Sequence, residues 1–237
     1  MNSSSDAFLA VVVGLIALFS VQARADNGEE LYGEMNAGKC SPALTTLQAQ
    51  ATAGNAESQY LLGAAYSNGV CLPKDSKRWI DLLSKAAGQG HAVARFSLAI
   101  AYEFGEDVEL DERRAVELYR SLAEQNVGVG QFNLGRMYEN GRGGLEKDDR
   151  QAVDWYRKSA NNGVAAGQKS LGRMYEEGRG GLKRDMRQAQ EWHKKAASRR
   201  SCRPNCNEYC EFSPSETPVL AALMCLVSFP PPFVRQK

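Results

Sequence analysis

The chain has 237 residues, which is enough for an ordinary domain with a substantial apolar core. Lys and Arg number 29, Asp and Glu number 28, and the two signs are interspersed, so the formal net charge is +1. A protein that binds mainly nucleic acid needs a concentrated basic face. The composition therefore argues against nucleic acid as the main partner.

The N-terminus carries the pattern of a secretory signal. Residues 7–21 form an apolar run of signal length that is short for a membrane span. The small-x-small tripeptide Ala23-Arg24-Ala25 follows it, so residues 1–25 are predicted to be a signal peptide cleaved after Ala25. No Lys or Arg precedes the run, which leaves an uncleaved anchor as the alternative. We expect a mature protein that is soluble and periplasmic or secreted.

Most of the remaining chain repeats itself. A Leu, a Tyr and a Gly recur together four times, with spacings of 36, 36 and 37 residues. The recurring residues are Leu62, Leu98, Leu134 and Leu171, then Tyr66, Tyr102, Tyr138 and Tyr175, then Gly69, Gly105, Gly141 and Gly178. The predicted repeats are residues 56–90, 91–126, 127–163 and 164–198. Within the N-terminal segment 26–55, residues 40–55 match only the second half of a repeat and are predicted to cap the array.

Each repeat is predicted to form two helices. In the first helix, a step of 100° per residue places Leu134 and Tyr138 on one side, and the small Gly135 beside them lets another backbone come close. A glycine-rich loop leads to an aspartate that can cap the second helix, at Asp75, Asp111, Asp148 and Asp185. A single helical hairpin cannot bury both faces, whereas stacked hairpins share one core. The pattern therefore predicts an all-α solenoid.

The repeat pattern, L-G-x-x-Y-x-x-G-x-G followed by an Asp-led loop and A-x-x-W-x-x-x-A-A, resembles the Sel-one-like repeat (SLR), a relative of the tetratricopeptide repeat. Residues 164–197 match it closely, and the resemblance covers residues 40–198. It implies a right-handed α-α superhelix of four helix-turn-helix repeats, with the first helices lining the concave side. It also implies an adaptor or regulator, a role that many members have in the bacterial envelope.

The sequence holds no recognisable catalytic constellation. The two histidines, His91 and His193, have no nucleophile partner at helical spacing, and the S-x-x-K motif of serine β-lactamases does not occur. The repeated glycine loop lacks the preceding strand and the Gly-Lys-Ser/Thr ending of a phosphate-binding loop. Its glycines are interpreted as turn residues, and Arg142 within it is expected in solvent. We expect no enzyme activity, no metal and no cofactor.

Six cysteines in an exported chain indicate oxidation rather than metal binding. Cys40 and Cys71 each precede a second helix, and we expect them to form a disulfide worth about 3 kcal/mol. Stacked repeats separate these two sites by about one repeat, so a disulfide requires that the loops carrying the two cysteines approach each other. For the segment 199–237 the alternatives are a misjoined C-terminus, a short capping helix and a metal site. Its cysteines are Cys202, Cys206, Cys210 and Cys225.

One side of each first helix is predicted to meet a partner. Opposite the Leu and Tyr, the third repeat presents Asn133, Arg136 and Asn140. The copies of these positions are Ser97, Ile100 and Phe104 in the second repeat, and Ser170, Arg173 and Glu177 in the fourth. Asn can pair with a peptide backbone and Arg with a carboxylate, whereas the alternative is a solvated face without a ligand.

The sequence thus predicts a monomeric, non-enzymatic scaffold of the cell envelope that binds a protein or peptide on its inner face. The alternative function, by analogy with cysteine-rich relatives, is a protein that binds cell-wall glycopeptide or penicillin.

Overall fold

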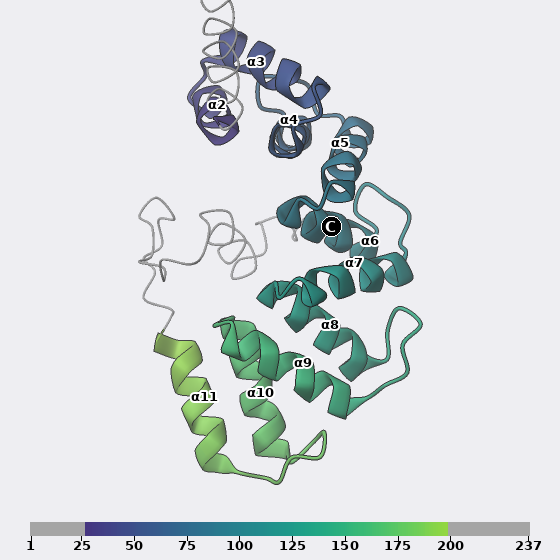
Figure 1. Ribbon diagram of the computed structural model, residues 1–237, viewed down its shortest axis with the longest axis vertical. Helices are drawn as coiled ribbons and strands as arrows, with labels where there is room; N and C mark the ends of the chain where they lie inside the picture. The colour runs from purple at the N-terminus through teal and green to yellow at the C-terminus, as the bar shows by residue number, and fades with distance from the viewer. Residues whose placement is uncertain (1–26, 199–237) are drawn as a thin grey trace, which may run out of the picture. The chain divides into compact units, whose positions relative to one another are not determined.

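The computed structural model describes residues 27–198, and these form ten α-helices without a strand (Figure 1). The expected all-α repeat architecture is confirmed. The predicted signal peptide and the segment 199–237 with its four cysteines lie outside the described residues. No described helix combines the length and the apolar character that a bilayer span requires. The chain divides into two compact units between His91 and Ala92.

Unit one comprises four described helices. They are α2 (Gly28–Asn36), α3 (Cys40–Thr52), α4 (Ala56–Asn68) and α5 (Ser76–Gly88). Helices α4 and α5 are the first full repeat, and α3 packs against both α2 and α4. The repeat pattern does not predict α2. This nine-residue helix adds Leu31 and Met35 to the core that Leu47 and Leu62 form, so the partial repeat α3 is covered on a second side.

The disulfide of unit one joins the start of α3 to the loop between α4 and α5. Cys40 and Cys71 are bonded with their Cα atoms 5.4 Å apart, across 31 residues of sequence, which confirms the predicted pair. The loop reaches α3 because Val70, Cys71 and Leu72 lie on the core shared by α2, α3 and α4. Cys71 has a positive φ of 58°, which a non-glycine residue rarely adopts.

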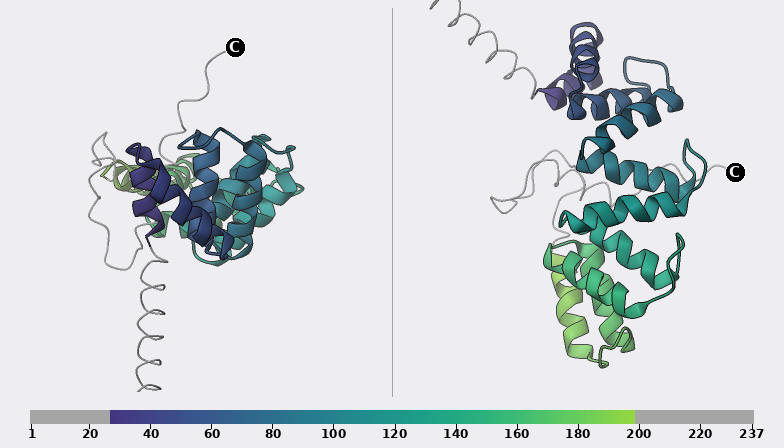
Figure 2. Two further views of the ribbon diagram at one scale, coloured as in Figure 1. Left: turned by 90° about the horizontal axis from the view of Figure 1, so that it is seen from above. Right: turned by 45° about the vertical axis from the view of Figure 1, so that its right-hand side comes forward.

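Unit two contains the other three repeats as consecutive helical hairpins. They are α6 (Ala92–Phe104) with α7 (Glu112–Glu124), α8 (Gly128–Asn140) with α9 (Asp149–Asn161), and α10 (Ala165–Glu177) with α11 (Met186–Ser198). Every helix of the unit packs against the next one, and α8 also contacts α10 (Figure 2). The repeated leucines Leu98, Leu134 and Leu171 are all buried, as their periodicity predicts.

Short-range chemistry sets the ends of these helices. The carboxylate of Asp148 accepts hydrogen bonds of 2.8 and 3.1 Å from the backbone N–H groups of Arg150 and Gln151, which have no helical partner. Helix α8 ends at Gly141, whose φ of 65° suits glycine. At Gly135, glycine is required by close packing rather than by the backbone conformation. A Cβ atom there would lie 2.9 Å from ring carbons of Tyr156, so α8 and α9 approach closely only without it.

Removing the disulfide should destabilise unit one. Cys40→Ser with Cys71→Ser frees a loop of about 30 residues in the unfolded chain, and we expect the free energy of unfolding to fall by about 3 to 4 kcal/mol. Urea unfolding can be followed by the fluorescence of Trp79 after both tryptophans of unit two have been replaced by Phe. Reductant should lower the unfolding midpoint of the parent protein and leave that of the double variant unchanged. Equal midpoints for parent and variant would contradict the prediction.

Candidate interaction site

The residues predicted to meet a partner differ widely in accessibility. Asn133 is only 4% exposed, and its Nδ2 atom donates a 2.9 Å hydrogen bond to the carbonyl oxygen of Val129 in the previous turn. Its prediction as a contact residue is therefore wrong. The physical reason is that α8 packs against α7, α9 and α10, so more than one side of the helix is covered. Ser97 and Ser170 are partly exposed.

The predicted arginines Arg136 and Arg173 bind acidic side chains of the preceding repeat. The Nη2 atom of Arg136 lies 2.7 Å from both carboxylate oxygens of Glu103. The Nη2 atom of Arg173 lies 2.7 Å from Oε2 of Glu139. These guanidinium groups thus already bind a carboxylate within the chain, and their prediction as partner contacts stays a prediction.

Glu103 is the centre of a first acid–arginine cluster, which comprises Glu103, Tyr119, Arg136, Arg142 and Glu112. The Glu103 side chain is fully buried, and it also accepts hydrogen bonds from the Tyr119 hydroxyl at 2.9 Å and from Nη1 of Arg142 at 2.8 Å. Arg142 also donates from Nε and Nη2 to Oε1 of Glu112, at 2.9 and 2.7 Å. The expectation that Arg142 stays in solvent is therefore wrong.

A second acid–arginine cluster repeats the first one repeat later. It comprises Glu139, Tyr156, Arg173, Arg179 and Asp149. Glu139 accepts from the Tyr156 hydroxyl at 2.7 Å and from Nη1 of Arg179 at 3.0 Å, in addition to Arg173. Arg179 forms a two-pronged contact with Asp149, with its Nη2 and Nε atoms 2.7 and 3.0 Å from the two carboxylate oxygens. Each cluster thus joins consecutive repeats of unit two.

Glu139 is held in its charged form. Burial opposes its ionisation, but hydrogen bonds from Arg173 and Tyr156 outweigh burial and hold the pKa of Glu139 below its usual range. Burial, and then the hydrogen bond to Glu139, raises the pKa of Tyr156, so this hydroxyl keeps its proton and remains a donor.

Each cluster has a second acid, Glu112 in the first and Asp149 in the second, which we call the outer acids. Their pKa values are lowered, as that of Glu139 is. The hydrogen bond from Arg142 lowers the pKa of Glu112, and that from Arg179 lowers the pKa of Asp149. Both carboxyls are therefore charged acceptors at neutral pH, and the clusters are networks of charge-assisted hydrogen bonds.

The sequence carried a signal for these clusters that the helical periodicity did not reveal. A glutamate directly follows the repeated tyrosine in three of the four repeats, and two arginines six residues apart occur in the third and fourth. The first repeat has Ser67 at the glutamate position, and the second repeat has Ile100 at the first arginine position.

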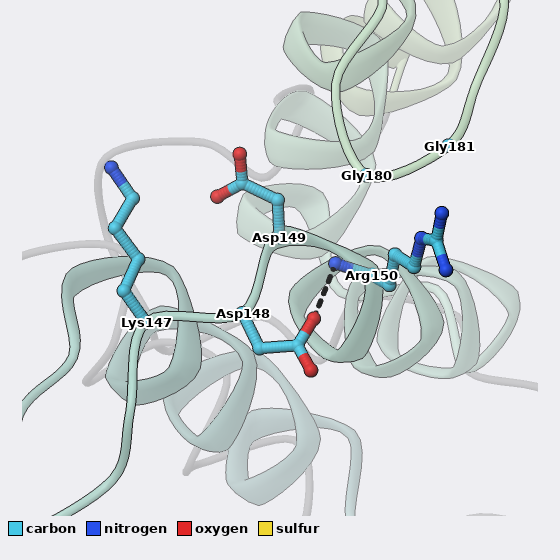
Figure 3. Close-up of a pocket in the computed structure, with 6 residues that line it drawn as sticks. All are labelled: Lys147, Asp148, Asp149, Arg150, Gly180 and Gly181. Atoms are coloured by element: carbon cyan, nitrogen blue, oxygen red, sulfur yellow. Dashed lines mark hydrogen bonds between the residues drawn. The ribbon is translucent and has the colours of Figure 1, made fainter.

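The glycine loops of the third and fourth repeats pack on second helices. An open pocket of about 420 Å³ lies between the start of α9 and the loop of the fourth repeat, lined by Lys147, Asp148, Asp149, Arg150, Gly180 and Gly181 (Figure 3). The carboxylate of Asp148 already accepts the first N–H groups of α9, and a second acid lines the same wall. Two acids and two basic residues line the pocket, so it carries no net positive charge that would hold a phosphate, which agrees with the interpretation of these glycines as turn residues.

The last residue of the first helix is exposed in the second, third and fourth repeats, and Ile100 lies one helical turn before Phe104 in α6. We name Ile100, Phe104, Asn140 and Glu177 the exposed ridge. Phe104 is 53% exposed, Asn140 and Glu177 are also exposed, and Ile100 is partly exposed. Phe104 is apolar where every other repeat has Asn or Glu. Among residues 27–198, no three His, Cys, Asp or Glu side chains are grouped so that they could hold a metal ion.

Acid should weaken unit two through the clusters. Because the pKa values of Glu112, Glu139 and Asp149 are lowered by folding, the unfolded chain binds more protons in acid. The free energy of unfolding should therefore fall as the pH drops below 4.5, the ordinary value for a glutamate. Urea unfolding between pH 7 and pH 3, followed by the fluorescence of Trp155 and Trp192, measures the effect.

The variant Glu139→Gln tests whether Glu139 contributes to this loss of stability in acid. Its free energy of unfolding at neutral pH should be about 3 kcal/mol lower than that of the parent, because two arginines lose their shared partner. Its free energy of unfolding should also fall less steeply as the pH drops. The control Glu117→Gln changes an exposed acid of α7 and should stay within about 0.5 kcal/mol of the parent. Parallel curves of stability against pH for the parent and Glu139→Gln would contradict the assignment.

The helical repeats and their packing can be compared with known proteins. A family model for the Sel1 repeat matches residues 56–91, 92–127, 128–164 and 165–201, which is more than half of the chain. A protective antigen of uropathogenic Escherichia coli strains that displays an SLR fold is 37% identical, with a TM-score of 0.63. A Sel1 repeat protein from Oxalobacter formigenes is 30% identical, with a TM-score of 0.65.

The match to the Escherichia coli antigen covers 66% of this chain and 33% of that protein, so this chain spans one third of the antigen's length. The match to the Oxalobacter formigenes protein covers 73% of this chain and 69% of that one. A comparison with curated proteins finds no match. With four matched repeats and the helical hairpins that they require, the chain belongs to the Sel1 repeat family.

Proposed function

We propose that the protein is a non-enzymatic scaffold outside the cytoplasm that binds a protein or peptide through the exposed ridge of unit two. Sel1 repeat proteins typically mediate protein–protein interaction, which gives the class of function. The observation that carries the site is Phe104, a large apolar side chain that is 53% exposed at a position where the other repeats are polar. Contacts of this kind anchor protein interfaces because burying them removes apolar surface from water.

The ridge combines one apolar anchor with polar neighbours. Phe104 and Ile100 lie one helical turn apart on α6 and offer apolar area for a side chain of the partner. Asn140 and Glu177 occupy the corresponding positions on α8 and α10. Nδ2 of Asn140 donates to the carbonyl oxygen of Arg136 at 2.9 Å, so Asn140 offers a partner its side-chain oxygen. Oε2 of Glu177 accepts from Nη1 of Arg179 at 3.0 Å, so Glu177 offers a partner its other oxygen. An extended peptide carrying one large apolar residue and a basic residue fits this distribution. The ridge does not depend on Arg136 or Arg173, since both are paired within the chain.

Two features support a location in the periplasm or outside the cell. The N-terminal pattern favours export with cleavage after Ala25. The Cys40–Cys71 disulfide requires an oxidising compartment to form and persist, which the cytosol of most cells does not provide.

The proposed export has a direct test. Protein recovered from the periplasm or culture medium should begin at Asp26, because signal peptidase removes residues 1–25, and N-terminal sequencing with intact mass measurement should show this. A variant with Ala23→Arg and Ala25→Arg, which removes both small residues of the cleavage site, should keep the full N-terminus and serves as the control. Full-length parent protein found only in the cytosol would contradict the proposal.

The ridge is tested by changing its anchor. Phe104→Asn introduces the residue of the first and third repeats and should weaken partner binding about tenfold, because the apolar contact is lost. Phe104→Tyr keeps the ring and should bind as the parent does. Affinity capture from envelope extract identifies the partner, and titration with the purified partner measures each dissociation constant.

Two outcomes would contradict the proposed function. One is a partner that binds the Phe104→Asn protein as tightly as the parent, which would place the contact elsewhere. The other is retention of labelled penicillin or of peptidoglycan by the purified protein in the absence of any associated protein. Equal unfolding midpoints for the two Phe104 variants are required in either case, so that a folding defect is not read as lost binding.

A further inference from the structure

The last repeat carries an incomplete copy of the acid–arginine cluster. Glu176 directly follows the repeated tyrosine, as Glu103 and Glu139 do in the two preceding repeats. Each of those two glutamates receives two arginines from the next repeat and a tyrosine hydroxyl from its own. Two repeats therefore show that a glutamate in this position binds two arginines and a tyrosine hydroxyl.

Glu176 has only part of this environment. His193 occupies the tyrosine position, with its Nε2 atom 3.1 Å from Oε1 of Glu176. Within the described part of the chain, Glu176 forms no ion pair with an arginine or a lysine. Its side chain is 39% exposed, compared with 0% for Glu103 and 9% for Glu139. The carboxylate thus retains room and acceptor capacity for guanidinium donors.

The surroundings of Glu176 differ from those of the inner repeats. The exposed Gln190 of α11 replaces Val153, a residue that is buried in the third repeat. Met186, which is 46% exposed, takes the place of the outer acid Asp149. The position that buries an apolar side chain in the third repeat is therefore polar and exposed in the fourth. A ligand here must bind mainly through charged hydrogen bonds, so its binding should weaken as salt is added.

We propose that Glu176 and His193 form a binding site for an arginine-bearing segment of another polypeptide. The segment presents two arginines six residues apart, one in the last turns of a helix and one in the loop after it, as Arg173 and Arg179 do for Glu139. Arginine suits the site better than lysine, because a planar guanidinium can donate two parallel hydrogen bonds to one carboxylate.

A second copy of this chain does not meet the requirement. Among residues 27–198, the arginine pairs with this spacing and with one arginine in a first helix and one in the loop after it are Arg136 with Arg142 and Arg173 with Arg179, and these are already bound to Glu103 and Glu139. Arg114 and Arg120 are also six residues apart, but both lie within α7. The ligand is therefore a different polypeptide. This site does not include the residues of the exposed ridge, so either proposal can fail without the other.

The probe is a synthetic peptide with the sequence of residues 165–181, which carries both Arg173 and Arg179. Fluorescence anisotropy of the labelled peptide, titrated with the mature protein at low salt, should show saturable binding that weakens as salt is added. A peptide with Gln in place of both arginines should not bind. Glu176→Gln should weaken binding of the arginine peptide about tenfold, the value of one charge-assisted contact. The control Glu191→Gln makes the same charge change on α11 and should have no effect.

A gain of binding gives an independent test. Met186→Asp supplies the outer carboxylate that the two inner clusters have at this position, so the arginine peptide should bind this variant several-fold more tightly than the parent. The proposal is overturned if Glu176→Gln and Met186→Asp both bind the arginine peptide with the affinity of the parent. It is also overturned if the parent shows no saturable binding, which would mean that the chain fills or blocks the site itself.

Discussion

The structure of unit two depends on buried carboxylates that are shared between consecutive repeats. Glu103 and Glu139 lie on first helices, and each accepts two guanidinium groups from the following repeat and one hydroxyl from its own. A buried carboxylate is costly without partners, and the removal of one partner leaves an uncompensated charge. The spacing of the arginines therefore constrains which surfaces of successive repeats can meet, in a way that apolar packing alone would not.

The clusters also determine which parts of the surface can take a partner. Arg136, Arg142, Arg173 and Arg179 would be attractive contact residues if they were free, because guanidinium groups recognise carboxylates well. All four are engaged within the chain. What remains accessible on the first helices is an apolar anchor at Phe104 with polar positions beyond it. In the proposed function, a partner that contacts Phe104 would leave the carboxylates of Glu103 and Glu139 with their arginines.

Unit one is held together by different means. Its short helix α2 contributes apolar side chains to the core, and the disulfide fixes the loop after α4 to the start of α3. A covalent link suits this end of the chain because the partial repeat α3 has no full hairpin of its own to bury its surface. An acid–arginine cluster is not an option for the first repeat, whose sequence has Ser67 at the glutamate position and Leu83 at the tyrosine position.

The sequence by itself determined the local structure, because the 36- or 37-residue period, the capping aspartates and the turn glycines act over a few residues. It also predicted the pairing of Cys40 with Cys71, which the redox chemistry of an exported chain favours. It did not determine the role of polar residues such as Asn133 and Arg136. A helical wheel separates the side facing the helix's own hairpin from the rest, but it does not show which neighbouring repeat covers the rest. Only the tertiary structure places Glu103 against Arg136, 33 residues away in sequence, and so decides which side chains are left for a partner.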